Sequence, residues 1–260
     1  MKAGIVGLPN VGKSTLFNCL SNAKAQSANF PFCTIEPNIG VVNVPDARLE
    51  RLEQLVAPER VVPATVEIVD IAGLVKGASK GEGLGNQFLS NIRETDAILH
   101  VLRCFDNDNI VHVDGSVDPI RDKETIDLEL QLKDLESVEK RLEKVSRAAR
   151  TGDKEAAKEQ AVLQQLKTAL ESAQSVRAIE LSEEDRLAYV RPLQLITDKP
   201  VLYVCNVEES AAVSGNAYVD RVRELAQAEQ AQILVLAVST EADINELDSY
   251  EERQLFLEDI

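Results

Sequence analysis

A motif close to the N-terminus has the residue types and the spacing that phosphate binding requires. It reads Gly7-x-x-x-x-Gly12-Lys13-Ser14, the pattern of a phosphate-binding loop, or P-loop. Its glycines let the backbone curl so that several N–H groups point at one phosphate, and the positive end of the following helix adds to the attraction. Lys13 can reach the β- and γ-phosphates of a nucleotide, and the Ser14 hydroxyl can bind Mg²⁺. The motif predicts contacts with a nucleoside triphosphate from Asn10, Val11, Gly12, Lys13, Ser14 and Thr15.

Two further residues have types and positions that can complete the metal site. Asp70 ends an apolar run and begins the sequence Asp-Ile-Ala-Gly73. A carboxylate at this position can hold a water of the Mg²⁺ ion, and the Gly73 N–H can contact the γ-phosphate and so sense hydrolysis. Thr34 lies in the loop between the P-loop and Asp70, where it can close over the metal as a second hydroxyl ligand. We therefore predict Ser14, Thr34 and Asp70 as the metal ligands.

The residues at the end of a late apolar run bear on the choice of base. A guanine-specific site carries Asn-Lys-x-Asp there, whereas this chain reads Asn206-Val207-Glu-Glu209. The longer glutamate side chain displaces the carboxylate by about one methylene, which spoils bidentate hydrogen bonding to guanine. Asn206 can still bond a purine, Val207 offers an apolar wall and a backbone carbonyl to an adenine amino group, and Phe105 can stack on the base or pack in the core. We predict adenine in preference to guanine; the alternative is an ordinary strand end that meets no base.

The elements that must position these groups alternate between strands and helices. Short, mostly apolar, β-branched runs are typical of strands buried on both faces. They occur at residues 4–6, 40–44, 66–70, 97–102, 200–206 and 232–238, with helical patterns at 14–20 and 219–229. The pattern predicts a doubly wound, mostly parallel α/β sheet of the P-loop NTPase (G-domain) type.

The middle of the chain has a different pattern. Residues 124–149 are charged and Leu-rich without Gly or Pro, and a second helical run ends near Ala173. Thr151-Gly-Asp153 separates the two, with Gly as a helix stop and Asp as the next N-cap. Two helices joined by a three-residue turn form an antiparallel hairpin, whose apolar stripe we assign to Leu128, Leu132, Leu135, Leu142 and Val145. The predicted division is residues 1–122 and 198–260 for the G domain and 123–197 for the helical insertion.

The composition indicates which kinds of partner and which cellular compartment to expect. The net charge is −16, and an acidic surface repels nucleic-acid phosphates, so we expect no broad nucleic-acid-binding face. The four cysteines lack metal-binding spacing and fit free thiols in a reducing compartment. No apolar stretch approaches the roughly 18 residues of a membrane span, and the N-terminus enters a strand without a charged-then-apolar leader. These features predict a cytoplasmic protein with no membrane partner.

Three longer motifs extend the P-loop pattern into a resemblance. They are Asn-Phe-Pro-Phe-Cys-Thr-Ile-Glu-Pro-Asn at residues 29–38, Asp-Ile-Ala-Gly-Leu-Val-Lys-Gly-Ala-Ser-Lys-Gly-Glu-Gly-Leu-Gly-Asn at 70–86, and Asn-x-x-Glu at 206–209. Together they resemble the YchF/Obg-like ATPase family, which belongs to the translation-factor class of P-loop GTPase folds. The resemblance implies an ATPase with altered base specificity, a helical hairpin inserted in the G domain, and association with the ribosome through its large subunit. Family members also carry a C-terminal TGS domain, which we expect to be missing because the chain stops at Ile260.

The resemblance also provides candidates for the hydrolytic step. Leu74 stands where many related proteins have a Gln that orients the attacking water, and leucine has no polar group for this task. The resemblance implies that His112 takes over by polarising the water near the γ-phosphate; the alternative is a surface histidine near the base of the hairpin. Asn10 is a second candidate, since an Asn at this P-loop position in related folds helps to hold K⁺, which supplies positive charge. Gly73, the γ-phosphate sensor, completes the catalytic prediction.

The sequence therefore predicts a slow, Mg²⁺-dependent ATPase that acts as a molecular switch. Two alternatives stay open. A GTPase of the Obg type requires Glu209 to replace the usual Asp, and a nucleotide-dependent scaffold requires no hydrolysis at all. The charged faces of the hairpin are also compatible with simple solvation, so the sequence assigns no contact to them.

Overall fold

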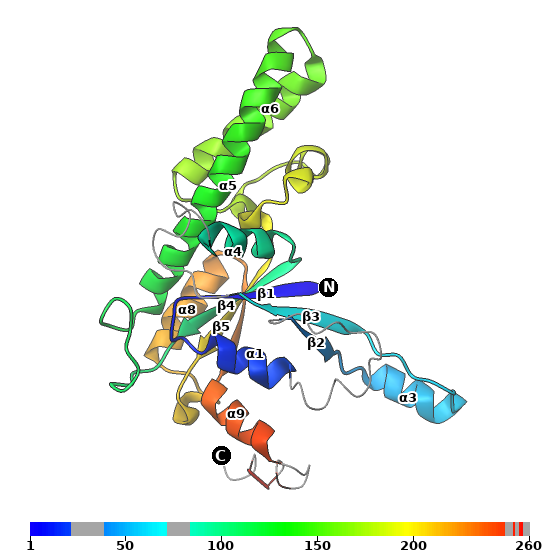
Figure 1. The fold of residues 1–260 in the computed structure, drawn as a ribbon, viewed down its shortest axis with the longest axis vertical. Helices are drawn as coiled ribbons and strands as arrows, with labels where there is room; N and C mark the ends of the chain where they lie inside the picture. The colour runs from blue at the N-terminus through cyan, green and yellow to red at the C-terminus, as the bar shows by residue number, and fades with distance from the viewer. Residues whose placement is uncertain (22–38, 72–83, 248–251, 253–254, 257–260) are drawn as a thin grey trace.

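The computed structural model describes residues 1–21, 39–71, 84–247, 252 and 255–256 of the chain. Within these ranges six strands form one sheet in the order β2-β3-β1-β4-β5-β6 (Figure 1). The strands are β1 Lys2–Val6, β2 Ile39–Asn43, β3 Thr65–Asp70, β4 Ala97–Arg103, β5 Val201–Asn206 and β6 Gln232–Leu236. Only β2 runs antiparallel to its neighbour in this sheet. The prediction of a mostly parallel, doubly wound α/β sheet is confirmed.

The order of the strands determines where a ligand can bind. β1 lies between β3 and β4, with Ile5 opposite Asp70 and Val6 opposite His100. After β1 the chain continues to β2 on one side of the sheet, and after β4 it continues to β5 on the other side, so that a topological switch point lies between β1 and β4. In open α/β sheets a crevice forms there, beyond the carboxyl ends of the strands. The P-loop follows β1 directly and therefore lies in this crevice.

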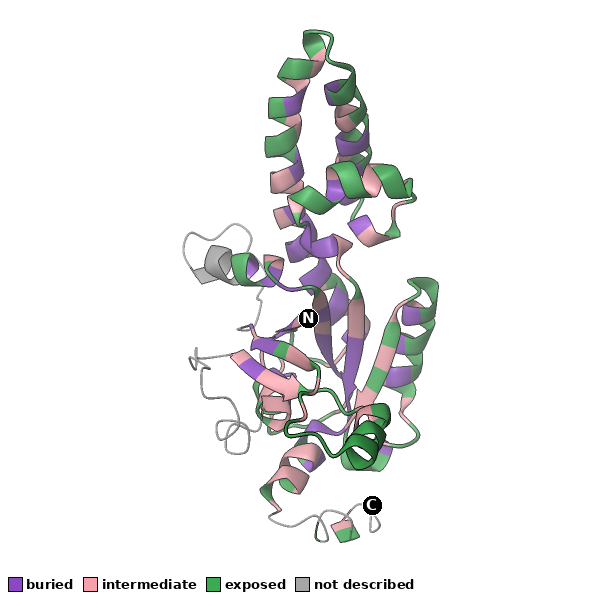
Figure 2. Cartoon of the chain, turned by 90° about the vertical axis from the view of Figure 1, so that its right-hand side faces the viewer, coloured by how far each residue is buried: buried purple, intermediate pink, exposed green. Residues whose placement is uncertain are grey.

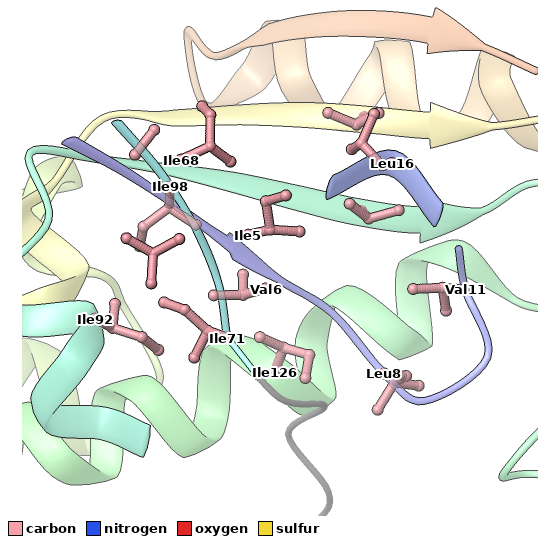
Figure 3. Packing of buried hydrophobic residues seen from close by; sticks show 14 of the residues in the cluster. Ile5, Val6, Leu8, Val11, Leu16, Ile68, Ile71, Ile92, Ile98 and Ile126 are labelled. Carbon is pink, nitrogen blue, oxygen red and sulfur yellow. The ribbon is translucent and has the colours of Figure 1, made fainter. Parts of the chain in front are cut away.

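The core is aliphatic and buries both faces of the central strands. Figure 3 shows Ile5, Val6 and Ile98 of the sheet packed against Ile92 and Ile126, and all five side chains are at most 1% exposed. β-Branched residues fit this environment because their restricted rotamers pack well on a pleated surface. Figure 2 shows the middle of the sheet as the most continuously buried part of the chain. The packing fixes β1, and with it the starting point of the P-loop.

Helices cover the sheet and connect its strands. They include α1 Lys13–Ser21, α3 Ala47–Val56, α4 Leu84–Arg93, α8 Ala217–Ala228 and α9 Val238–Glu246. The sequence analysis did not predict α3, although Asp46 caps it by accepting a hydrogen bond from the Arg48 N–H at 2.9 Å. The strand expected at residues 232–238 ends at Leu236, because Ala237 is the N-cap of α9. In the part of the chain that the structure describes, no helix combines the length and the apolar character needed to cross a membrane.

The predicted helical hairpin is present and projects from the sheet (Figure 1). Its helices are α5 Pro119–Arg150 and α6 Lys154–Glu171. Gly152 ends the first helix with a φ of 90°, and the Asp153 carboxylate caps the second by accepting the Glu155 N–H at 2.9 Å. The facing side chains form their own small core, which contains Val138, Val145, Val162, Leu163, Leu166 and Leu170. The division at residues 123 and 197 stays a prediction; the helix itself begins at Pro119.

One residue of the expected apolar stripe was assigned wrongly. Leu128 is 44% exposed. In this part of α5 the buried face lies on the main sheet core instead of on α6, and it consists of Ile126 and Leu130. The expected stripe requires α5 to pack against α6 along its whole length. In the structure the first part of α5 packs against the sheet core, and only the later part packs against α6.

A buried aspartate fastens the hairpin to the sheet. Asp134 of α5 is 0% exposed. Its carboxylate accepts hydrogen bonds from the Ile196 N–H at 2.9 Å, the Thr197 N–H at 2.7 Å and the Thr197 hydroxyl at 2.7 Å. These two residues lie just before β5. The hairpin is therefore tied at its base to the segment that leads the chain back into the sheet.

Candidate functional site

The P-loop occupies the turn between β1 and α1. Gly7 has a φ of 154° and Gly12 a φ of 101°, and Asn10 adopts a φ of 62°. A Cβ atom on Gly7 would lie 2.5 Å from the Val101 carbonyl oxygen, and one on Gly12 would lie 2.5 Å from Nδ2 of Asn206. Glycine is therefore required at both positions by the close approach of β4 and β5, as well as by the backbone conformation.

Lys13 begins α1 and turns back over the loop. Its ammonium donates a hydrogen bond to the Leu8 carbonyl oxygen at 2.6 Å, and the residue is 7% exposed. Burial lowers the pKa of Lys13 to about 8, and the nearby Asp70 carboxylate acts in the opposite direction. A buried, poorly solvated ammonium is a strong point charge for a phosphate. The Leu8 carbonyl holds this charge inside the loop.

Ser14 and Asp70 meet at the mouth of the loop. The Ser14 hydroxyl donates a hydrogen bond to Oδ2 of Asp70 at 3.1 Å. Oδ1 of the same carboxylate is buried and has no hydrogen-bond partner among the residues that the structure describes. A buried carboxylate oxygen without a partner is costly. A hydroxyl and a carboxylate are oxygen ligands that Mg²⁺ accepts, with waters and phosphate oxygens in the remaining positions. The residues present fit a Mg²⁺ ion.

Asn206 joins the end of β5 to the P-loop. Its Nδ2 donates to the Val11 carbonyl at 2.9 Å, and its Oδ1 accepts from the Val238 N–H at 3.1 Å. The residue is 5% exposed. An amide NH₂ has two N–H donors, and Val11 occupies one of them. Asn206 thus fastens the loop and the start of α9, and it keeps one donor for a ligand.

The other residues at this strand end are placed differently from the expectation. The Val207 side chain is 2% exposed and packs in a core cluster with Leu102 and Tyr203, so it is not the expected apolar wall for a base. Of the two contacts expected from Val207, only the hydrogen bond that its backbone carbonyl would accept from an adenine amino group stays a prediction. Glu209 accepts a hydrogen bond from the Thr240 hydroxyl at 3.3 Å. Its carboxylate is held by α9, at the position where a guanine-specific site has a free Asp.

The loop after β4 depends on a residue that the sequence analysis missed. Arg103 is 2% exposed, and its guanidinium donates to the carbonyls of Phe105 at 3.1 Å, Ile110 at 2.9 Å and Asn107 at 3.1 Å. The same group lies 4.8 Å from the centre of the Phe105 ring. Arg103 organises the loop, and it covers Phe105, the candidate for base stacking. The only sequence signal was a charged residue directly after an apolar strand.

His112 lies near the end of this loop with both ring nitrogens engaged. Nε2 is 2.8 Å from Oδ2 of Asp122, and the Asp114 N–H donates to Nδ1 at 3.1 Å. An Nδ1 atom that accepts a hydrogen bond has no proton, so Nε2 carries it and donates to Asp122. The side chains of His112 and Asp122 are 6% and 2% exposed. The ring is therefore held against α5, unlike the surface histidine of the alternative interpretation.

The His112 cluster is a poor metal site, although its ligand types would allow one. His112, Asp114 and Asp122 each place one potential ligand atom within 4.8 Å of the others. However, the Arg121 guanidinium lies 3.0 Å from Asp122 and 3.7 Å from Asp114. This charge supplies the cation that the two carboxylates need. We assign no metal here.

The predicted site residues divide into three groups: those that the structure brings together, those whose side chains it does not place in this cluster, and those outside the described residues. The structure brings together the P-loop, Asp70 and Asn206, and it links Asn10 to the His112 loop, because Nδ2 of Asn10 donates to the Val111 carbonyl at 3.1 Å. Thr15 is exposed on α1, and the Val11 side chain is buried, so that this side chain is not accessible to a ligand. Thr34 and Gly73, predicted as metal ligand and γ-phosphate sensor, lie outside the described residues.

A P-loop after the first strand, a carboxylate at the end of β3 and an asparagine that binds the loop from β5 define a P-loop nucleotide hydrolase with a G-domain fold. A family model described as 50S ribosome-binding GTPase matches residues 2–134. Because it is more than half identical to the YchF proteins of two bacteria over at least 70% of their length, the chain belongs to the YchF family. This assignment confirms the resemblance found in the sequence.

Relatives from bacteria and yeast support the assignment. The chain is 55% identical over 262 residues to the ribosome-binding ATPase YchF of Bacillus subtilis (strain 168) and covers 71% of it. It is 54% identical over 259 residues to the ribosome-binding ATPase YchF of Escherichia coli O157:H7 and covers 70% of it. Both matches span all of this chain. The solved structure of the Schizosaccharomyces pombe YchF GTPase is 37% identical, with a TM-score of 0.85 over the whole chain and 71% of that protein.

Proposed function

We propose that this chain is a Mg²⁺-dependent molecular switch that binds ATP, hydrolyses it and associates with the ribosome. The observation that carries the proposal is the hydrogen-bonded pair of Ser14 and Asp70, whose second carboxylate oxygen is buried without a described partner. The pair lies beside a buried lysine in a P-loop. Phosphate, metal and ammonium therefore have adjacent places at one end of the sheet.

The groups of the chain act on the nucleotide through binding and orientation. Lys13 leaves the Leu8 carbonyl and donates to the β- and γ-phosphates, while Ser14 and Asp70 hold Mg²⁺, with Thr34 proposed as a further ligand. Bound Mg²⁺ neutralises charge on the phosphate oxygens. Gly73 is proposed to sense the γ-phosphate. His112 is proposed to polarise the attacking water, which requires one of its ring nitrogens to release its present partner.

Asn10 is proposed to hold K⁺ next to the phosphates. Its Nδ2 donates to Val111, so the amide oxygen is the atom available to a cation. The two roles do not compete, because they use different atoms of one side chain. A monovalent cation here supplies positive charge to the transition state in the way that an arginine finger does elsewhere.

Two features of this strand end favour adenine over guanine. The Glu209 side chain is one methylene longer than the usual Asp, and its Oε2 accepts a hydrogen bond from the Thr240 hydroxyl at 3.3 Å, which disfavours bidentate pairing with guanine N1 and N2. The Val207 backbone carbonyl can accept a hydrogen bond from an adenine amino group, and Asn206 keeps one N–H donor. Phe105 is proposed to stack on the base, with Arg103 on its ring. The two bacterial relatives are named ATPases, whereas the yeast structure is described as a GTPase. An Obg-type GTPase therefore remains the second candidate.

Competition between nucleotides tests the proposed base. A fluorescent ATP analogue bound to the chain with Mg²⁺ should be displaced by ATP at a concentration at least about tenfold lower than by GTP, a difference of about 1.4 kcal/mol. A preference for GTP would identify an Obg-type GTPase. Single-turnover hydrolysis of each triphosphate separates an enzyme from a scaffold, since a scaffold binds ATP without releasing phosphate.

The pH dependence of nucleotide affinity tests the role of Lys13. The pKa of Lys13 is lowered to about 8 in the free chain because of burial, and contact with phosphate raises it again because negative charge favours the ammonium. Binding is therefore coupled to proton uptake above pH 8, and affinity should fall up to about tenfold per pH unit from there. Calorimetry in two buffers of different ionisation enthalpy measures the uptake. An affinity that is constant from about pH 7.5 to 9.5 would refute this role of Lys13.

The ribosome is proposed as the partner on the strength of the relatives. The two bacterial proteins are named ribosome-binding, and the description of the matching family model names the 50S subunit. We propose the large subunit as the contact and the cytoplasm as the compartment. Co-sedimentation of the chain with purified subunits in the presence of ATP and Mg²⁺ measures this association directly.

A further inference from the structure

The two hydrogen bonds of the His112 ring differ in strength. Asp122 is a buried carboxylate in the first turn of α5, where the helix dipole favours negative charge. Its second oxygen, Oδ1, accepts from the Arg121 guanidinium at 3.0 Å. The Nε2–H donor of His112 thus meets a fixed anion, and a charge-assisted hydrogen bond is roughly twice as strong as a neutral one.

The bond on the other side of the ring is weaker and easier to exchange. It joins Nδ1 to the backbone N–H of Asp114 at 3.1 Å, and the Asp114 side chain is 45% exposed. Both partners of this bond are uncharged, and the loop around it is open to water. When a water molecule competes for one ring nitrogen, the Asp114 N–H is the partner that yields. Nδ1 is then the nitrogen that meets the water.

We propose that Asp122 is a positioning residue for hydrolysis, and this rests on the proposed function of His112. Asp122 keeps the proton on Nε2, so that the lone pair of Nδ1 is available to accept a hydrogen bond from the attacking water. Once the attacking water has displaced the Asp114 N–H, Asp122 is the partner that still fixes the tautomer. Without this carboxylate the ring then samples both tautomers and loses its orientation, as a general acid–base group does when its orienting partner is removed. Asp122 touches neither substrate nor metal; it acts through the ring.

Residues Val111 and His112 together connect the P-loop with the hairpin. Asn10 holds Val111, the residue before His112, and Asp122 holds His112 from α5. The next residue of α5, Lys123, forms ion pairs with Asp127 at 2.8 Å and with Glu229. The start of α5 is thus fixed to α8 as well as to the catalytic loop. Asp122 is the point at which the hairpin contacts the proposed catalytic machinery.

Nuclear magnetic resonance provides a readout that does not depend on activity. The chain has two histidines, and the pKa of His100 is lowered to about 3 by burial, so its neutral ring is an internal control. In ¹⁵N-labelled protein, at a pH where the ring carries a single proton, His112 should show a protonated Nε2 and an unprotonated Nδ1. In Asp122→Ala the His112 signals should move towards the average of two tautomers, because the weaker Asp114 N–H bond alone then favours Nε2–H, while the His100 signals stay in place. A unique Nε2–H tautomer in Asp122→Ala would overturn the proposal.

Single-turnover kinetics then test the consequence for hydrolysis. Asp122→Ala and the isosteric Asp122→Asn should lower the rate about 10- to 100-fold and change the affinity for ATP less than about twofold. Asp122→Asn keeps the side-chain volume, so it tests the proposal even where Asp122→Ala folds poorly. Asp127→Asn is the matched control, since Asp127 is also buried on the same helix, at 8% exposed against 2% for Asp122, but contacts Lys123 instead of the loop. Its rate should stay within about twofold of the unmodified chain.

The double variant tests the roles of His112 and Asp122 in hydrolysis separately. If His112→Ala slows hydrolysis and adding Asp122→Ala slows it no further, both residues act in one step, as proposed. If His112→Ala is slow but the Asp122 variants keep the full rate, the role of Asp122 is wrong while that of His112 stands. If His112→Ala keeps the full rate, the proposed function of His112 is wrong, and so is a role of Asp122 in hydrolysis. The tautomer measurement then still shows whether Asp122 orients the His112 ring. A faster Asp122→Ala would show that Asp122 restrains His112, which overturns the proposal.

Discussion

A Lys13→Ala variant is expected to lose ATP hydrolysis by at least about 100-fold and to bind ATP about 10- to 100-fold more weakly. The affinity change follows from the loss of charge-assisted hydrogen bonds to phosphate, worth about 1.5–3 kcal/mol. The rate falls further because the ammonium also stabilises charge that develops in the transition state. Single-turnover phosphate release and calorimetric titration with ATP and Mg²⁺ measure the two effects separately.

The same variant should fold normally without nucleotide. Burial disfavours the charged form of Lys13, as its lowered pKa shows, so removing the charge costs the free chain little stability. The melting temperature of the nucleotide-free variant should match that of the unmodified chain, whereas its increase on adding ATP should shrink, because ligand stabilisation follows affinity. A variant that melts much earlier without ATP would show that Lys13 is structural, and retained hydrolysis would contradict the proposed site.

The largest expected effect on stability belongs to Asp134. In Asp134→Ala the Ile196 and Thr197 N–H groups and the Thr197 hydroxyl lose their acceptor inside the protein. An unsatisfied buried donor costs about 1–3 kcal/mol, and water that enters the cavity recovers part of this. We expect a loss of about 3–5 kcal/mol in the free energy of unfolding, which lowers the melting temperature by about 10 °C. Chemical denaturation and calorimetry measure both quantities.

Asp153→Ala is the matched control for this experiment. Asp153 also accepts two backbone hydrogen bonds at a helix end, from Glu155 at 2.9 Å and Ala156 at 3.1 Å, but it is exposed at the far end of the hairpin. Water can replace these bonds, so its loss should cost only about 1 kcal/mol. Equal losses for the two variants would show that burial of Asp134 is not the source of its effect.

Local patterns made part of the site predictable. The P-loop lies within eight residues, and Asp70 is the last residue of an apolar run. Each therefore has a signature that can be read without knowing the fold. The alternation of strands and helices predicts a mostly parallel sheet, but not the order of its strands. The placement of Ser14 against Asp70 needed only the rule that parallel strands end at one edge.

Contacts between distant residues were not predictable in the same way. The bond from Asn206 to Val11 joins residues 195 positions apart, and no periodic pattern encodes it. Asp122 was missed for a different reason. The helix was expected to start at residue 124, although Asp118 and Pro119 are a favourable N-cap and first residue, and α5 begins there. The earlier start brings Asp122 into the first turn, within reach of His112.

The length of α5 has a mechanical consequence. The helix is continuous for 32 residues, and Asp122 is its fourth. At 1.5 Å per residue, roughly 40 Å of helix extends beyond the contact with His112. A rotation of about 5° around that contact displaces the far end of the hairpin by roughly 4 Å, while the contact itself shifts by only a few tenths of an ångström. The hairpin is thus geometrically a lever arm with its pivot at the His112 loop. A rearrangement at this pivot that is too small to alter the fold moves the far end of the hairpin by about the length of a side chain.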